Sequence, residues 1–385
     1  MFPIKKPKEL GMLRATLAAA AVLFAIQGAT AEENIVIGLS TPLSGSVAAL
    51  GQHENWGASL AAKEINEAGG INGKQIQVEA QDNQCNPTQG ITSVENLLEK
   101  NPIAVIGALC SSVTLAVMPV MERAERPLMV GVATSPIITE QAGVGGNQWT
   151  FRINPSDAGL AVALGKYLAD KGSIKTIAFV GEDTDYGRGG HSAMAEALKG
   201  TGIEIVSADF YKQGTPDFTT VLTRIKTAKP DAVALYATGV DELGFIRQYR
   251  GMNIDSLLSG RVSLDELLPV IQAGALEDAS SVYPYAVELD TPENKAFVEK
   301  FKATYGELPN NQSFQGYESI RVLADALKRS KELTPAALRN ALKGTDMTSV
   351  TGGTIKFDDH NQAHNLALIM KVKDGVIVIE TTSGT

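Results

Sequence analysis

The sequence predicts an α/β protein with two lobes, each built from a parallel sheet and the helices that cover it. Strand-like runs alternate with helical patterns of ordinary length from residue 35 to about residue 260. Several strands, such as residues 104–106 (AVI) and 232–235 (AVAL), are apolar throughout, which is typical of strands covered on both faces. The alternation occurs in two successive sets that meet near residues 152–155, so we expect two sheets rather than one.

The amino-acid composition is that of a folded, acidic protein. The chain has 385 residues, of which 44% are hydrophobic and 20% charged, and this length suits two domains, or at most three. With 34 basic and 43 acidic residues, the formal charge of −9 gives no general attraction to nucleic acid. Four histidines and two cysteines leave little material for a metal cluster.

The first set of elements has clear start and stop signals. The helix expected over 58–68 is stopped by Gly69 and Gly70, and the helix over 88–99 begins at Asn86-Pro87, a capping residue followed by proline. Strands are expected over 35–39, 75–80, 103–107, 127–132 and 149–153, and a further helix over 113–125.

The second set repeats this rhythm, and the last third of the chain departs from it. In the second set, helices are expected over 159–170, 189–199, 218–228 and 241–250, and strands over 176–180, 203–208, 232–237 and 257–259. Three helical patterns follow (291–305, 315–330 and 335–342), and the chain ends in strand signals over 353–357, 366–372 and 376–381. Lys373-Asp374-Gly375 predicts a hairpin turn between the last two strands.

Residues 1–31 have the pattern of a secretory signal peptide. A basic head over 5–14 precedes a mostly apolar stretch that ends at residue 26, and the small residues Ala29-Thr30-Ala31 follow. The uninterrupted apolar run over 17–26 is too short to span a bilayer core of about 30 Å, which disfavours a membrane anchor. We therefore expect cleavage after Ala31 and a soluble product exported to a periplasm or an equivalent oxidising space.

The two cysteines predict a disulfide. Cys85 and Cys110 lie 25 residues apart, and disulfides persist in exported proteins. Each cysteine follows an apolar strand-like run, and we expect adjacent parallel strands to bring the two ends close enough for a bridge. Two free thiols are the alternative.

The sequence offers no clear catalytic or metal-binding constellation. The serines lack the Gly-x-Ser-x-Gly setting of a nucleophile on a strand-to-helix turn. His360 and His364 have the spacing of a metal pair only if they lie on a helix, whereas Asp358-Asp359-His360-Asn361 favours a turn between strands. We therefore expect no catalytic residue, no metal and no cofactor.

Polar groups follow two strands of the first set, at the end of a sheet where ligands bind in α/β proteins. Ser111 and Ser112 follow the strand over 103–107 and open a helix, where hydroxyls and free backbone N–H groups suit a carboxylate. Plain helix capping by either serine is the alternative. The next strand ends at Val132-Ala133-Thr134, whose carbonyl and hydroxyl groups suit an ammonium or an amide, with a cap or turn as the alternative.

On these residues the chain resembles the periplasmic branched-chain amino-acid-binding proteins of ABC importers, which have the type I periplasmic-binding fold. The resemblance covers nearly the whole predicted mature chain and rests on residues 65–73 (INEAGGING), 85–87 (CNP), 105–112 (VIGALCSS), 133–136 (ATSP), 183–187 (DTDYG) and 217–218 (DF). It implies two doubly wound, Rossmann-like lobes joined by three crossover strands, a Venus-flytrap arrangement. We assign residues 32–152 plus 283–353 to lobe 1 and residues 153–282 plus 354–385 to lobe 2.

The resemblance also implies roles for particular residues. Ser111 matches the serine that binds the ligand carboxylate, with Ser112 as its neighbour. Val132 matches a residue that offers its carbonyl to the ligand ammonium, Ala133 follows it, and Thr134 matches a threonine that contacts both ends of an amino acid.

In the second lobe, Tyr186 matches the tyrosine that closes over the ligand, but two other positions depart from the family pattern. Leu50 stands where many members carry an aromatic residue, and Arg261 stands where many carry the acidic residue that completes the ammonium clamp. An arginine would repel an ammonium and favour a second carboxylate or a carbonyl. A hinge or surface ion pair is the alternative for Arg261, and Tyr283 and Tyr285 either line the cleft or pack at the hinge.

The implied function is that of a periplasmic solute-binding protein. It captures a small carboxylate-bearing solute by hinge closure, in the first place a branched-chain or other hydrophobic amino acid, and delivers it to a membrane permease of an ABC importer. An aromatic or dicarboxylic acid or a small amide is the alternative ligand, and a periplasmic ligand sensor is the alternative role. We expect a monomer that performs no catalysis and has no nucleic-acid partner.

Overall fold

The computed structural model describes residues 1–3 and 34–384. The chain divides into two units, residues 1–34 and 35–385, and the second unit holds every helix and strand described below. Apart from residues 1–3, the predicted signal peptide lies outside the described residues. Among the helices that the structure describes, none combines the length and the apolar character that crossing a membrane requires.

The first sheet has five parallel strands in the order β2-β1-β3-β4-β5. Its strands are β1 (Ile35–Thr41), β2 (Ile76–Asp82), β3 (Ala104–Gly107), β4 (Leu128–Val130) and β5 (Thr150–Arg152), and its helices are α2 (Ala48–Glu67), α3 (Pro87–Leu98), α4 (Ser111–Arg123) and α5 (Pro136–Glu140). Strands β3 and β4 are buried along their whole length, as their apolar sequences predict. The predicted start of α3 is confirmed, because the Asn86 side chain accepts hydrogen bonds from the N–H groups of Thr88 and Gln89.

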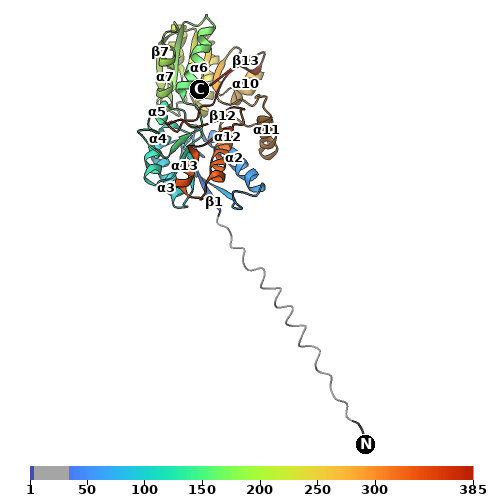
Figure 1. Ribbon diagram of the computed structural model, residues 1–385. Coiled ribbons are helices and arrows are strands. Elements are labelled where there is room, and N and C mark those ends of the chain that lie inside the picture. The colour runs from blue at the N-terminus through green and yellow to red at the C-terminus, as the bar shows by residue number, and fades with distance from the viewer. Residues whose placement is uncertain (4–33, 385) are drawn as a thin grey trace. The chain divides into compact units, whose positions relative to one another are not determined.

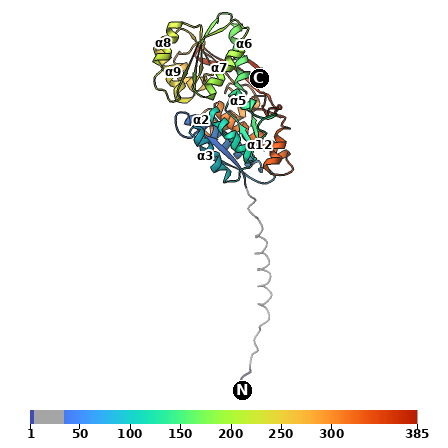
Figure 2. The same ribbon diagram turned by 90° about the vertical axis from the view of Figure 1, so that its left-hand side faces the viewer.

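The second sheet has four parallel strands in the order β7-β6-β8-β9. Its strands are β6 (Thr176–Glu182), β7 (Glu204–Tyr211), β8 (Ala232–Tyr236) and β9 (Leu257–Gly260), and its helices are α6 (Asp157–Asp170), α7 (Asp185–Ala197), α8 (Thr219–Ala228) and α9 (Gly239–Gly251), followed by the short η1 (Leu264–Leu267) and α10 (Leu268–Gln272). Helices α6 to α9 lie in one half of the unit, and α2, α3 and α12 lie in the other (Figures 1 and 2).

The last third of the chain contributes to both halves. Strands β10 (Ser280–Tyr283), β13 (Leu366–Lys373) and β14 (Val376–Gly384) form an antiparallel sheet, and Asp374-Gly375 makes the predicted hairpin turn. Between them lie α11 (Pro292–Tyr305), α12 (Asn311–Arg329), α13 (Pro335–Leu342) and the pair β11 (Met347–Thr348) and β12 (Thr354–Ile355). The chain thus passes between the halves after β5, after β10 and before β13, and the fold is the type I periplasmic-binding fold. The lobe boundaries given above stay predictions.

Helix α2 begins ten residues before its predicted start. The prediction missed these residues because the first half of the helix has no regular apolar stripe. Two glycines in the α2–α12 contact replace side-chain packing with close backbone contact. A Cβ atom at Gly57 would lie 1.9 Å from the carbonyl oxygen of Ser313, and one at Gly316 would lie 2.1 Å from that of Glu54. Helix α12 also starts early, at Asn311, because Asn310 and Ser313 form a capping box.

We predict that Gly57→Ala lowers the free energy of unfolding by about 1–3 kcal/mol, because the new methyl group forces α2 and α12 apart. Denaturant unfolding would measure the change. The control is Gly251→Ala at the end of α9, where an added Cβ meets no atom within 4 Å; we expect a change within about 0.5 kcal/mol. Equal stability of the two variants would contradict the close contact.

Candidate functional site

A cavity of about 640 Å³ lies where the carboxyl ends of the two parallel sheets face each other. Its wall comes from the segments that follow β2, β3 and β4 in the first sheet and β6 to β9 in the second, with further residues from α2, from the end of β10 and from the start of α12. All the residues predicted to bind the ligand line it, namely Leu50, Ser111, Ser112, Val132, Ala133, Thr134, Tyr186 and Arg261. The structure therefore brings together residues from both halves of the sequence.

Ser111 is the first residue of α4, and no side chain caps this helix. The residue in the capping position is Cys110, so the interpretation of Ser111 and Ser112 as plain caps is wrong. The Ser111 hydroxyl oxygen accepts a hydrogen bond from the backbone N–H of Ser135 at 3.2 Å, which leaves its proton free to donate. A free hydroxyl beside the uncapped N–H groups of a helix start is suited to a carboxylate.

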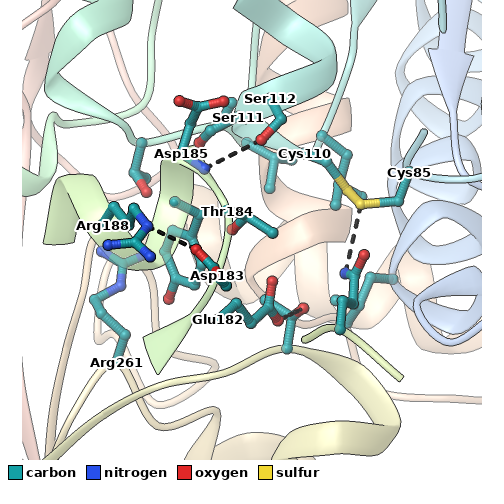
Figure 3. Close-up of a pocket in the computed structure, with 18 of the residues that line it drawn as sticks. Cys85, Cys110, Ser111, Ser112, Glu182, Asp183, Thr184, Asp185, Arg188 and Arg261 are labelled. Carbon is teal, nitrogen blue, oxygen red and sulfur yellow. Dashed lines mark hydrogen bonds and ion pairs between the residues drawn. A yellow bond between two sulfur atoms is a disulfide. The ribbon is translucent and has the colours of Figure 1, made fainter. Parts of the chain in front are cut away.

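Ser112 joins the two halves of the molecule. Its hydroxyl oxygen accepts a hydrogen bond from the backbone N–H of Asp185 at 3.1 Å (Figure 3). A second bond, from the N–H of Val240 to the carbonyl of Ser46 at 3.2 Å, connects the start of α9 with the segment before α2. The halves are in direct contact on either side of the cavity, so the structure has its cleft closed.

The predicted disulfide is confirmed, with the Cα atoms of Cys85 and Cys110 5.6 Å apart. The expectation that adjacent strands carry the two cysteines is wrong, because β1 lies between β2 and β3. The loops after β2 and β3 meet beyond the end of β1, where the Asn83 amide donates to the Ala108 carbonyl at 3.1 Å and to the Ser40 hydroxyl at 3.2 Å. The disulfide fixes the residue immediately before Ser111.

The groups predicted to receive an ammonium already have partners. The Thr134 hydroxyl donates to a carboxylate oxygen of Asp157 at 2.8 Å, and the Val132 carbonyl accepts from the Asn154 amide. Asp157 is fully buried in the first turn of α6, and burial raises its pKa. Sequence reasoning missed this residue, although Ser156-Asp157 at a helix start marks it as an acidic residue of the first turn.

Arg261 is both an ion-pair partner and part of the cavity wall. Its Nη1 lies 3.5 Å from Oδ1 of Asp157, and its guanidinium carbon lies 4.2 Å from the centre of the Tyr283 ring. Only 4% of its side chain is exposed. Burial opposes the charge on Arg261, but the combined attraction of Asp157 and the hydroxyls of Tyr283, Tyr186 and Tyr236 raises its pKa. The guanidinium therefore stays protonated.

The apolar part of the wall comes from Leu50, which lies on α2 and packs with Val47 and Leu109 beside the disulfide. Tyr283 lines the cavity, whereas Tyr285 stacks on Phe314 with ring centres 4.8 Å apart. The sequence analysis did not identify several polar lining residues, namely Glu182, Arg188, Lys212, Gln213, Thr238 and Asn311. The sequence could have indicated them by their position at the ends of strands of the second sheet or at the start of α12.

The two histidines considered above have other partners within the protein. His360 contacts the carbonyl of Ala142 at 3.0 Å, and His364 contacts Asp358 at 3.1 Å. Among the described residues there is no group of three or more metal-ligating side chains.

Two facing lobes with a cavity of mixed polar and apolar lining between them are the arrangement of a solute-binding protein, and comparison with known proteins gives its family. Residues 34–376 match the model of the periplasmic binding protein family. The chain is 27% identical over 338 residues to the leucine-, isoleucine-, valine-, threonine- and alanine-binding protein of Pseudomonas aeruginosa, covering 87% of this chain and 88% of that protein. It is 30% identical over 339 residues to an amino acid binding protein of the same organism, with 85% and 89% covered. The chain belongs to the periplasmic binding protein family.

Solved structures agree with this fold. The branched-chain amino acid transporter substrate binding protein LivJ from Streptococcus pneumoniae, in complex with isoleucine, is 27% identical with a TM-score of 0.80, covering 92% of this chain and 99% of that chain. An ABC-transporter solute binding protein from R. palustris, in complex with benzoate, has a TM-score of 0.83 at 23% identity, with 91% and 96% covered. The second likeness is one of fold.

We predict that replacing both cysteines, Cys85→Ser with Cys110→Ser, lowers the free energy of unfolding by about 3–4 kcal/mol through the lost loop constraint. Solute affinity should fall as well, because the start of α4 loses its anchor. Guanidinium unfolding and titration calorimetry measure the two effects, and the wild-type protein under reducing conditions is the comparison. A variant as stable as the oxidised protein would contradict this prediction.

The pH dependence of stability should reflect Glu182, since burial raises its pKa to about 7 from 4.5. The contribution of the neutral Glu182 side chain to the free energy of unfolding is fully present below pH 4.5 and is lost as the pH rises to about 7. The reason is that the carboxyl group ionises near pH 4.5 in the unfolded chain but only near pH 7 in the folded protein, so rising pH favours the unfolded chain. We predict that in Glu182→Gln the free energy of unfolding falls by about 3 kcal/mol less over this pH range than it does in the wild-type protein. Unfolding curves between the two pH values measure it, with exposed Glu95→Gln on α3 as the control. The same decline in both variants would refute the assignment.

Proposed function

We propose that this protein is the solute receptor of an ABC importer and binds a small carboxylate-bearing solute in the cavity between its lobes. The observation that carries the proposal is the uncapped start of α4, where Ser111 lines the cavity and its hydroxyl proton has no acceptor among the described residues. Hinge closure buries the solute, and the closed form is recognised by a membrane permease. The ligand stabilises the closed state by the contacts that it makes there and not in the open state.

The relatives suggest the class of solute. Two of them are named for branched-chain or other amino acids, and LivJ holds isoleucine, so a hydrophobic amino acid is the first candidate. A non-amino acid such as an aromatic carboxylate is the second candidate, because Arg261 presents a cation where an ammonium would need an acceptor. The benzoate in the R. palustris protein is in keeping with this second candidate.

The surroundings of Ser111 fit a protein that binds its solute without catalysing a reaction. Within the described residues, its hydroxyl contacts a backbone N–H group and no base. A nucleophilic serine needs a base that receives its proton. We propose that the protein acts as a monomer, and that it reaches the periplasm by means of a signal peptide cleaved after Ala31.

We predict that Ser111→Ala weakens binding of the solute by roughly 10- to 100-fold, the value of one hydrogen bond to a carboxylate. Thermal shift with leucine, phenylalanine and benzoate identifies a binder, and titration calorimetry then compares the variants. The control is Ser192→Ala, an exposed serine on α7. Unchanged affinity in Ser111→Ala would show that the carboxylate site is misplaced.

A further inference from the structure

The Arg261 side chain is buried with part of its hydrogen-bonding capacity unused. Its Nε and Nη1 atoms have no hydrogen-bond partner among the described residues, although the side chain is only 4% exposed and lines the cavity. The Tyr283 ring covers one face of the guanidinium and accepts no in-plane hydrogen bond from it. Buried N–H donors without an acceptor are unfavourable, so these donors call for an acceptor that enters the cavity.

Asp157 does not satisfy these donors. The 3.5 Å between Nη1 and Oδ1 is an ion-pair separation without a hydrogen bond, and Oδ1 itself has no hydrogen-bond partner. The other carboxylate oxygen accepts from Thr134. Asp157 therefore balances charge and leaves the guanidinium fork free for a second partner.

A second buried arginine adds to the positive charge behind the wall. Arg152 donates to the carbonyl of Ser135 at 2.8 Å, to the Gln362 amide oxygen at 2.6 Å and to the Thr139 hydroxyl, all of which are neutral. Within the described part of the chain, no carboxylate lies within ion-pair distance of it, and the carboxylates that attract it from further away are first Asp157 and then the partly exposed Asp358.

Among the buried groups, Arg152, Asp157 and Arg261 carry two positive charges against one negative charge, and the partly exposed Asp358 is the further carboxylate that attracts Arg152. The other groups that act on Arg261 are the neutral hydroxyls of Tyr186, Tyr236 and Tyr283. Three acidic residues also line the cavity: Glu182 accepts from the Thr238 hydroxyl and has Asp241 as its charged neighbour, Asp183 pairs with Arg188, and Asp185 donates its backbone N–H to Ser112. An ammonium beside Thr134 would face this excess positive charge.

We propose that Arg261 is a ligand-binding residue and that the solute is a carboxylic acid without an ammonium group, one of whose oxygen atoms accepts from the free guanidinium N–H groups. The inference rests on the proposed function and, of the two candidate classes of solute given there, selects the second, the acid without an ammonium group. That oxygen belongs either to the carboxylate that Ser111 also binds or to a second acceptor at the far end of the solute. In both cases a solute oxygen atom accepts a hydrogen bond from the Arg261 guanidinium.

The decisive experiment compares acids that differ only in the ammonium group, by calorimetric titration of the wild-type protein. The probes are leucine with isocaproate and ketoisocaproate, phenylalanine with phenylpyruvate, glutamate with glutarate, and benzoate. We expect an acid without the ammonium group to bind at least about tenfold tighter than its amino counterpart. Tight binding of isocaproate or benzoate would assign the oxygen to the single carboxylate, and preference for ketoisocaproate or glutarate would assign it to a second acceptor.

Tighter binding of leucine, phenylalanine or glutamate than of the matched acids would overturn the inference and leave the proposed receptor function standing. Failure of every probe at millimolar concentration would count against both.

Variants test the residue itself. Arg261→Gln should weaken the best acid by roughly 10- to 100-fold, while Arg261→Lys should lose less because it keeps the charge. Arg224→Gln, at an exposed ion pair with Asp209 on β7, is the control for loss of a cation. If Arg261→Gln fails to fold, the double variant with Asp157→Asn restores charge balance and replaces it. Unchanged affinity in the variant that folds would remove Arg261 from the site.

Discussion

The buried carboxylate of Asp157 ties the two halves of the molecule together behind two residues of the cavity wall, Thr134 and Arg261. It begins the first helix after the chain leaves β5, accepts from Thr134 at the end of β4, and pairs with Arg261 at the end of β9. Removing one partner of a buried ion pair is strongly destabilising, by about 3–5 kcal/mol, because the remaining charge has no solvent. The position of the solute-binding groups therefore depends on this interaction, and the chemistry of the cavity floor follows from it.

The cavity has two walls of different character. The first-lobe wall is set by the disulfide and by the Asn83 amide, which together hold the segment before α4 rigidly. The opposite wall contains charged groups, among them Glu182, Asp183, Arg188 and Arg261 (Figure 3). The Arg261 guanidinium contacts both Asp157 and the Tyr283 ring. Hydrogen bonds at Ser112 and Ser46 cross the cleft. Such contacts suit a hinge, because a closed state that is only weakly favoured leaves the solute to decide the equilibrium.

The sequence pattern predicted much of the fold. Apolar runs gave the strands of both sheets, and cap residues such as Asn86 gave helix starts, because burial on two faces and capping are local requirements. The beginning of α2 could not be predicted, since Gly57 in its first half serves a contact with α12, which lies far away in sequence. The strand order that places β1 between the two cysteine-bearing loops also depends on distant pairing.

The sequence by itself determined the two-lobed α/β class, the cysteine pair and the polar groups at the strand ends. These features could be predicted because hydrophobic periodicity and turn preferences depend on residues that are close together in the sequence. Only the tertiary structure decided what these groups do. It gave the Thr134 hydroxyl and the Val132 carbonyl partners within the protein, and it placed Arg261 against Asp157 with donors still free. Whether a charge is balanced depends on every group that packs around it, and residues 134, 157 and 261 meet only after the chain has folded.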